Sequence, residues 1–277
     1  MNTEMKIGNR IFDTADQTYI MGILNVTPDS FSDGGKWNEL DKALIHAEQM
    51  VKDGADIIDI GGESTRPGHE QITEEEEIGR VVPAIEAVKS RIDVPVSIDT
   101  YKYQVAKAAV EAGADLVNDI WGLKYDSRMA GLIAQTGTAC CLMHNKEKAE
   151  YNHFYREMLQ EMEECVEIAR AAGILDDKII LDPGVGFGKT YEMNLETIHY
   201  MERFHSLGYP MLLGTSRKSV IGLTLDLPAD QREEGTLVTT VMAVMKKYSF
   251  VRVHDVKANK RAIQMAKAIL AAGSKEL

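Results

Sequence analysis

Eight short apolar runs recur along the chain, and nearly every run ends at a polar or charged residue. A segment with helical periodicity follows each run, and the helix after the fourth run is expected to be short. Alternation of strands and helices predicts a parallel sheet with helices packed outside it. Eight such units suggest that the sheet closes into an α/β fold of the (β/α)8 TIM-barrel type. The strands are expected at residues 19–25, 57–60, 94–98, 116–117, 139–143, 178–181, 211–213 and 250–253.

In a barrel of this kind the carboxyl ends of all the strands open into one shared mouth. The polar residues that end the runs are therefore the first candidates for active-site residues. These endings are Asn25, Gly62-Glu63, Asp99, Asn118, His144, Asp182, the 215–219 segment, and Arg252 with His254.

Two β-prone pieces, around residues 6–7 and 10–12, precede the first run. We expect them to form a short N-terminal β-hairpin that closes the amino-terminal end of the barrel. A barrel typically takes about 250 residues as one domain, and no linker or low-complexity stretch divides the 277 residues. One domain over residues 1–277 is therefore expected.

The formal net charge of −12 argues against nucleic acid or an anionic membrane surface as a partner, because proteins that bind these are normally basic. No apolar run approaches the roughly 18 residues of a membrane span. The three cysteines show no paired spacing, and the first residues show no signal-peptide core. We therefore expect a cytoplasmic protein.

The segment from Asp182 to Thr190, DPGVGFGKT, invites interpretation as a phosphate-binding loop. Pro183 stands where the P-loop motif requires glycine, and Lys189 stands where the dinucleotide fingerprint requires its last glycine. We expect instead a flexible loop with Asp182 at its base, on which Phe187 could stack against a flat ligand.

Asp99, Asn118 and Asp182 end three different runs, so their side chains converge if the barrel forms. An ionised carboxylate only accepts hydrogen bonds, whereas an asparagine amide donates and accepts. This combination suits a heterocycle with an amino group and a ring N–H on one edge, such as a pterin or a guanine-like ring. The alternative for each residue taken alone is a strand-end cap.

Lys218, Arg252 and His254 are cationic or hydrogen-bond-donating residues near the last two strands, where barrels often bind phosphate. The spacing of two between Arg252 and His254 predicts that both side chains lie on the same strand face. Asn25 could ligate a hard cation such as Mg²⁺. His144 has no evident partner, and we interpret it as structural or pocket-lining.

Two segments, Met21–Gly35 and Asp59–Gly68, resemble the signature segments of the dihydropteroate synthase family. The resemblance covers essentially the whole chain, without a departure at a motif position. It extends through residues 97–100, 118–120, 181–189, 214–219 and 252–255.

The resemblance implies condensation of 6-hydroxymethyl-7,8-dihydropterin diphosphate with p-aminobenzoate, inhibition by sulfonamides, and a homodimer packed through late helices. The implied pterin-binding residues are Asp99, Asn118, Asp182 and Lys218. The implied diphosphate-binding residues are Asn25, Arg252 and His254, with Mg²⁺ at Asn25. The implied p-aminobenzoate-binding residues are Phe31, Thr65, Arg66, Pro67, Phe187 and Ser219. Asp33, Arg66 and Lys218 are the expected catalytic residues, the first two on loops that act as lids.

We predict a dissociative reaction, because no strong base is evident beside the amine site. Two alternatives remain open. A methyltransferase domain that uses methyltetrahydrofolate with a corrinoid partner would bind the pterin edge in a similar way, but it would not require the Arg252/His254 pair. A non-catalytic pterin-binding module would not need Asn25 and Lys218.

Overall fold

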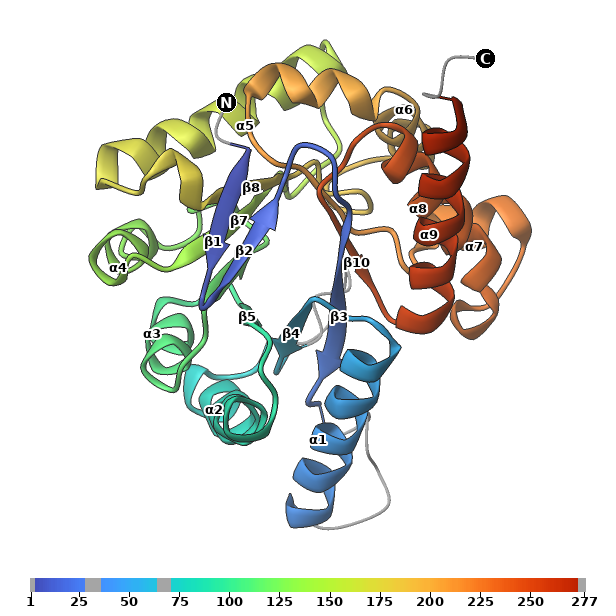
Figure 1. Cartoon of the computed structure of the whole chain (residues 1–277). Helices are drawn as coiled ribbons and strands as arrows, with labels where there is room; N and C mark the ends of the chain where they lie inside the picture. The colour runs from blue at the N-terminus through green and yellow to red at the C-terminus, as the bar shows by residue number, and fades with distance from the viewer. Residues whose placement is uncertain (1–2, 28–35, 64–70, 274–277) are drawn as a thin grey trace.

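The computed structural model describes residues 3–27, 36–63 and 71–273 of the chain. Eight parallel strands form a ring whose neighbour order is β8-β7-β6-β5-β4-β3-β10-β9 (Figure 1). A bridge between Leu181 and Met211 links the two ends of this order, which closes the ring. The predicted barrel is therefore confirmed. Its strands are β3 (Tyr19–Asn25), β4 (Ile57–Gly61), β5 (Val96–Asp99), β6 (Leu116–Asp119), β7 (Ala139–Met143), β8 (Ile179–Asp182), β9 (Leu212–Leu213) and β10 (Phe250–Val253).

Helices follow the strands and pack around the outside of the ring (Figure 1). The helix after the fourth barrel strand, α4, has eight residues, so it is short as predicted. The α-helices are α1 (Lys36–Asp53), α2 (Glu74–Arg91), α3 (Tyr103–Glu111), α4 (Met129–Thr136), α5 (Phe154–Ala172), α6 (Tyr191–His199), α7 (Ser219–Leu225), α8 (Glu233–Met245) and α9 (Val256–Gly273). Short 3-10 turns lie at η2 (Asp176–Lys178), η3 (Met201–Leu207) and η4 (Ala229–Gln231).

The hairpin of β1 (Glu4–Ile7) and β2 (Arg10–Asp13) was predicted from the sequence and is confirmed. Its apolar side chains pack with residues at the amino-terminal ends of the barrel strands, in one buried cluster. This cluster fills the amino-terminal end of the barrel, so a ligand would be expected at the carboxyl-terminal end. The cluster comprises Met5, Ile7, Phe12, Met21, Ile57, Leu116, Ala139, Cys141, Ile180, Leu212 and Phe250.

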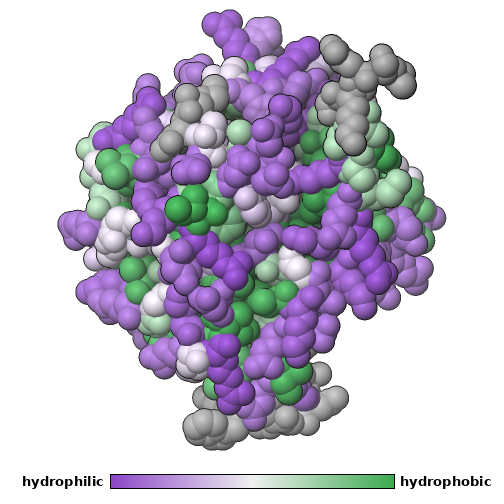
Figure 2. Space-filling model, in the orientation of Figure 1, coloured by the Kyte–Doolittle hydropathy of each residue, from purple (hydrophilic) through white to green (hydrophobic). Residues whose placement is uncertain are grey.

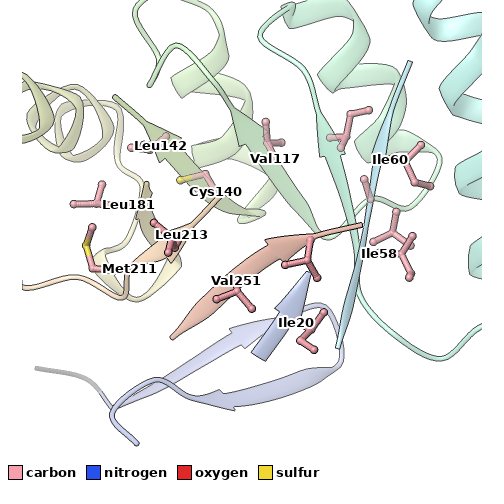
Figure 3. Packing of buried hydrophobic residues seen from close by; sticks show 14 of the residues in the cluster. Ile20, Ile58, Ile60, Val117, Cys140, Leu142, Leu181, Met211, Leu213 and Val251 are labelled. Carbon is pink, nitrogen blue, oxygen red and sulfur yellow. The ribbon is translucent and has the colours of Figure 1, made fainter. Parts of the chain in front are cut away.

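The other face of each strand builds the main core. Successive strand residues point to opposite faces, and the outward-pointing ones meet the helices in one large apolar cluster (Figure 3). Burial of each large aliphatic side chain stabilises the fold by about 1.5–3 kcal/mol. The inward-pointing positions near the carboxyl ends are therefore free to carry polar groups, and they do so at Asp59, Asp99, Asn118, Asp182 and Arg252.

Across the described ranges, no helix is both long and apolar enough to span a bilayer.

Candidate active site

A buried ion-pair cluster lies at the centre of the barrel mouth. Arg252 on β10 donates from Nε to Asp59 Oδ2 on β4 and from Nη2 to Asp99 Oδ2 on β5, each at 2.6 Å. The two carboxyl side chains are 0% and 5% exposed, and the arginine side chain is 17% exposed. The guanidinium thus joins two neighbouring strands to a strand that lies on the far side of β3 from them.

The environment changes the acidity of these groups. Burial raises the pKa of Asp99 to about 7, while the charge of Arg252 opposes this shift and the charge of Asp59 adds to it. For Arg252, burial opposes the charged form, but the two carboxylates outweigh burial and raise its pKa. The arginine is therefore always a cation, whereas Asp99 changes charge near neutral pH.

Asp59 is a site residue that the ends of the apolar runs do not reveal, because it lies inside a run. A signal was present, because the run Ile57–Ile60 is interrupted by one aspartate, and a carboxylate buried in a strand needs a partner.

Several polar atoms of the cluster remain without a protein partner. Among the described residues, Asp59 Oδ1, Ser97 Oγ and Asp99 Oδ1 are buried and make no hydrogen bond. Asn118 Nδ2 lies 3.5 Å from Asp59 Oδ2. Since buried polar atoms are normally satisfied, this group presents hydrogen-bonding capacity for a polar molecule in the mouth.

Asp182 and Lys218 face the same mouth from the other side. Asp182 Oδ1 accepts a 2.7 Å hydrogen bond from Gly184 N, which fixes the carboxylate at the base of the loop that follows β8. The Lys218 ammonium donates to Val185 O and lies 4.5 Å from the centroid of the Phe187 ring. Burial lowers the pKa of Lys218 to about 8, and the charge of Asp182 counteracts this shift.

A strained residue directs Lys218 into the mouth. Arg217 has a φ of 58°, which is uncommon for a residue other than glycine. The Arg217 side chain pairs with Asp255, with Nη2 at 2.6 Å from Oδ1, and its backbone N–H donates to Thr236 Oγ1 at 3.2 Å. These contacts hold the turn between β9 and α7 from which Lys218 projects.

The remaining described candidates lie around this centre. His254 and Ser216 are joined at 2.9 Å between Nδ1 and Oγ, and His254 N donates to the same oxygen at 3.1 Å. Asn25 is exposed at the end of β3. A Cβ placed on Gly61 would lie 3.5 Å from Asn25 Oδ1 and 3.7 Å from Asp99 Oδ2, so both side chains flank the same strand end. Ser219 is exposed at the first residue of α7.

Five predicted site residues lie outside the described residues, and the structure leaves their roles untested. They are Phe31, Asp33, Thr65, Arg66 and Pro67.

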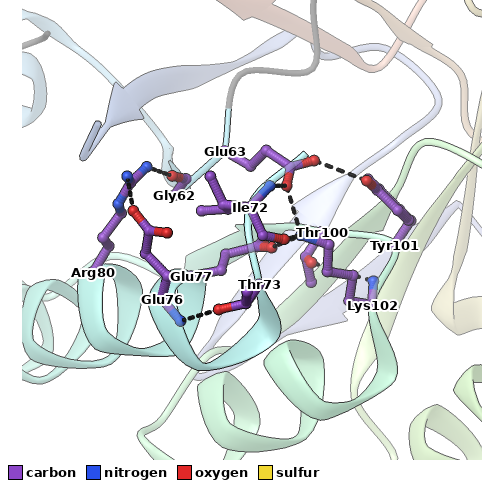
Figure 4. Close-up of polar contacts among 10 residues, drawn as sticks. All are labelled: Gly62, Glu63, Ile72, Thr73, Glu76, Glu77, Arg80, Thr100, Tyr101 and Lys102. Atoms are coloured by element: carbon purple, nitrogen blue, oxygen red, sulfur yellow. Dashed lines mark hydrogen bonds and ion pairs between the residues drawn. The ribbon is translucent and has the colours of Figure 1, made fainter. Parts of the chain in front are cut away.

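Glu63, which ends the second run, belongs to a buried ionic cluster beside the mouth (Figure 4). The Lys102 ammonium contacts Glu63 Oε2 at 2.5 Å, Glu77 Oε2 at 2.8 Å and Ile72 O at 2.8 Å. Tyr101 donates from its hydroxyl to Glu63 Oε1 at 2.8 Å. The cluster therefore ties the end of β4 to α2 and to the start of α3.

His144 has partners that the sequence did not reveal. Its Nε2 lies 3.0 Å from Glu161 Oε2, and its Nδ1 lies 2.9 Å from Lys189 Nζ. Glu161 comes from α5 and Lys189 from the connection after β8, so folding brings together groups that are 17 and 45 residues away in sequence.

Comparison with known proteins gives a consistent result. Residues 21–254 match the family model described as pterin binding enzyme. The sequence is 58% identical to the dihydropteroate synthase of Clostridium beijerinckii, over 96% of this chain and 99% of that protein. A dihydropteroate synthase structure from Clostridium difficile, obtained in the presence of pteroic acid, aligns with a TM-score of 0.91 at 49% identity and covers 93% of this chain and 98% of that one. The dihydropteroate synthase of Xanthomonas albilineans with 4-aminobenzoic acid aligns with a TM-score of 0.92 at 37% identity, covering 98% and 99%.

Proposed function

The chain belongs to the pterin-binding enzyme family and, within it, to the dihydropteroate synthases, and from this premise we propose how its residues carry out the reaction. The enzyme is a transferase that joins p-aminobenzoate to the pterin methylene of 6-hydroxymethyl-7,8-dihydropterin diphosphate. The products are 7,8-dihydropteroate and diphosphate. The observation that carries the assignment of the site is the convergence of Asp99, Asn118, Asp182 and Lys218 on one buried polar mouth.

The hydrogen-bonding pattern of the mouth complements one edge of a pterin. The amino group and the adjacent ring N–H of the pterin are donors, and the carboxylates of Asp99 and Asp182 are acceptors. Asn118 and Lys218 supply donors for the carbonyl oxygen and the ring nitrogens. The unpartnered Asp99 Oδ1 supports this arrangement, because a pterin donor would satisfy it.

We propose that the diphosphate lies between Asn25, Arg252 and His254. Arg252 already pairs with two carboxylates, so a divalent cation would supply much of the positive charge that the diphosphate needs, with His254 as a further hydrogen-bonding group. Magnesium prefers oxygen ligands and commonly takes most of them from phosphate and water. The exposed amide oxygen of Asn25 fits such a site, and among the described residues no cluster of three His, Cys, Asp or Glu side chains offers a protein-only metal cage. Bound Mg²⁺ would neutralise the charge of the leaving group.

The same geometry favours a dissociative order of bond changes. The C–O bond to diphosphate breaks first and leaves a cation on the methylene, delocalised into the pterin ring. The carboxylates of Asp99 and Asp182 stabilise this positive charge, because both are buried and their charges are little screened by solvent. The arylamine nitrogen then attacks with its lone pair and afterwards loses a proton. If isotope exchange into the bridging oxygen of the pterin diphosphate requires p-aminobenzoate, the dissociative order fails.

A diphosphate-release assay tests the function. We expect release that depends on the pterin diphosphate, p-aminobenzoate and Mg²⁺ together, and a sulfonamide should compete with p-aminobenzoate. Turnover of methyltetrahydrofolate with a corrinoid acceptor in place of this reaction would favour the methyltransferase alternative.

We also infer that two copies of the chain pair through α7, α8 and α9. Seven of the thirteen exposed large hydrophobic side chains among the described residues lie on these helices, so the apolar surface is concentrated there. Figure 2 shows apolar atoms on the side where Figure 1 draws α8 and α9. The seven are Leu223, Leu225, Val238, Met245, Met265, Ile269 and Leu270.

Sedimentation velocity tests the pairing. Val238→Glu and Met265→Glu place charge at residues that are 61% and 62% exposed, and each should shift the protein from dimer to monomer. Ile11→Glu, at a 66% exposed position on the hairpin, is the matched control and should leave the dimer intact. A monomeric parent protein would refute the inference.

The three cysteines are unpaired and buried, which supports a reducing, cytoplasmic compartment for the enzyme.

A further inference from the structure

The loop from Pro183 to Gly188 packs closely against the backbone that follows β7. A Cβ on Gly184 would lie 1.9 Å from His144 O, and one on Gly188 would lie 2.4 Å from Lys146 O. Both glycines also have positive φ, of 67° and 55°. Only glycine lets the two backbones approach this closely without moving apart. The glycines of the motif therefore allow the two loops to pack against each other.

One buried lysine holds the folded shape of this loop. The Lys189 ammonium donates to Gly184 O at 2.9 Å and to Phe187 O at 3.0 Å. Its third contact is His144 Nδ1 at 2.9 Å. An ammonium has three donors and no acceptor, so these contacts use its full capacity.

The contacts also determine which nitrogen of His144 carries the proton. Nδ1 faces an ammonium, so it must accept, and the ring proton is on Nε2. From there the ring donates to Glu161 Oε2 at 3.0 Å, and Glu161 Oε1 pairs with Lys146 at 2.7 Å. Burial lowers the pKa of His144 to about 4, and the charge of Lys189 adds to the shift, so the ring is neutral at neutral pH.

Lys189 and Lys218 both donate to backbone carbonyl oxygens of one loop. Lys189 takes those of Gly184 and Phe187, and Lys218 takes that of Val185 while lying over the Phe187 ring. The position of Lys218 in the mouth therefore depends on the loop shape that Lys189 maintains.

We propose that His144 and Lys189 are positioning residues for the synthase reaction: His144, in its Nε2–H tautomer, orients the Lys189 ammonium, which holds the 183–188 loop where Phe187 and Lys218 meet the substrates. The proposal rests on the proposed function for its kinetic consequence. Neither residue is among the proposed substrate-binding residues.

Two substitutions of His144 test the roles of its two ring nitrogens separately. In His144→Asn the amide oxygen can replace Nδ1 as the acceptor for Lys189, whereas in His144→Gln the longer side chain can replace Nε2 and reach Glu161. We expect His144→Gln and Lys189→Met to raise the KM for p-aminobenzoate about tenfold, the scale of one lost charge-assisted hydrogen bond. His144→Asn should remain within about twofold of the parent in both KM and kcat.

Lys124→Met is the matched control, because Lys124 also binds α5, through Glu161 O and Glu164, but does not contact the loop. The assays are made at pH 6.5. Burial lowers the pKa of Lys189 to about 7, while Asp182 raises it, so the ammonium form is favoured at that pH.

Hydrogen exchange of the 184–188 amides provides a readout that does not require activity. Exchange should accelerate in His144→Gln and Lys189→Met, but not in His144→Asn or Lys124→Met. Equal effects of the two His144 substitutions, or parent-like behaviour of His144→Gln, would overturn the proposal. If His144→Gln does not fold, Lys189→Met decides in the same way. An inactive parent enzyme would refute the proposed function, whereas the exchange data would still decide the role of His144.

Discussion

Protonation of Asp99 should weaken pterin binding as the pH falls through 7. Its Oδ1 is buried without a protein partner, and we assign it to accept a hydrogen bond from the pterin edge. The ionised carboxylate accepts at both oxygens, whereas the protonated carboxyl would place a donor against a donor either at the pterin or at Arg252.

The size of the effect follows from the position of the titration. Burial, with a contribution from the charge of Asp59, raises the pKa of Asp99 to about 7. If only the ionised form binds, the competent fraction falls from about nine-tenths at pH 8 to about one-tenth at pH 6, so the dissociation constant should rise about tenfold. Binding that depends on an ionised carboxylate weakens as the pH falls. Binding that depends on a charged lysine would instead weaken as the pH rises, because its charged form is then lost.

Calorimetric titration of a pterin ligand between pH 5.5 and 8 measures this dependence directly. Asp99→Asn is the necessary comparison, because asparagine keeps one acceptor oxygen but cannot titrate, so its weaker binding should be nearly independent of pH below 7. Constant affinity of the parent enzyme from pH 8 to pH 6 would refute the reasoning. So would a tenfold dependence that persists in Asp99→Asn.

Three further predictions concern the frame around the site. Asp59→Asn removes one anionic partner of the buried Arg252 and should lower the free energy of unfolding by about 3 kcal/mol, measured with urea; it should also move the midpoint of the pH profile of pterin binding downward. Gly184→Ala should cost about 3 kcal/mol or more because its Cβ meets a backbone oxygen, whereas Gly131→Ala in α4, where nothing lies within 4 Å, should be neutral or stabilising. Lys102→Met should lower the free energy of unfolding by about 3–5 kcal/mol at pH 7. The loss should be smaller at lower pH, because burial raises the pKa of Glu77 and removal of the Lys102 charge raises it further; an equal loss at both pH values would contradict this account.

The barrel and the outline of its mouth could be predicted from the sequence because both depend on local patterns. Continuous apolar runs, separated by helical stripes, indicate where strands end, and strand ends in a closed parallel sheet must share one mouth. Asp99, Asn118 and Asp182 were found in this way, since each lies within the last two residues of its strand.

The partners of these residues could not be predicted by the same reasoning. The contact between Arg252 and Asp59 joins residues that are 193 apart, and the Lys102 cluster joins residues from the end of β4, the start of α2 and the start of α3. Spacing along the chain carries no signal for such pairs. What the sequence does show is an isolated charge inside an apolar run, and such a charge predicts a buried partner without identifying it.

The position of Arg252 also changes which charged residues of the mouth should be assigned to the pterin and which to the diphosphate. The sequence suggested one group for the pterin and another for the diphosphate, but the guanidinium binds the carboxylates of Asp59 and Asp99 directly. With Asp182 and Lys218 included, three carboxylates face two cations, so one negative charge is in excess when all are ionised. At about 5 Å and an effective dielectric constant near 20, one unit charge is worth about 3 kcal/mol to a cation. This excess favours positive charge on the pterin methylene, and the charge of Arg252 opposes the rise in the pKa of Asp99. The arginine therefore links pterin recognition to departure of the diphosphate, and a change at Arg252 should impair both.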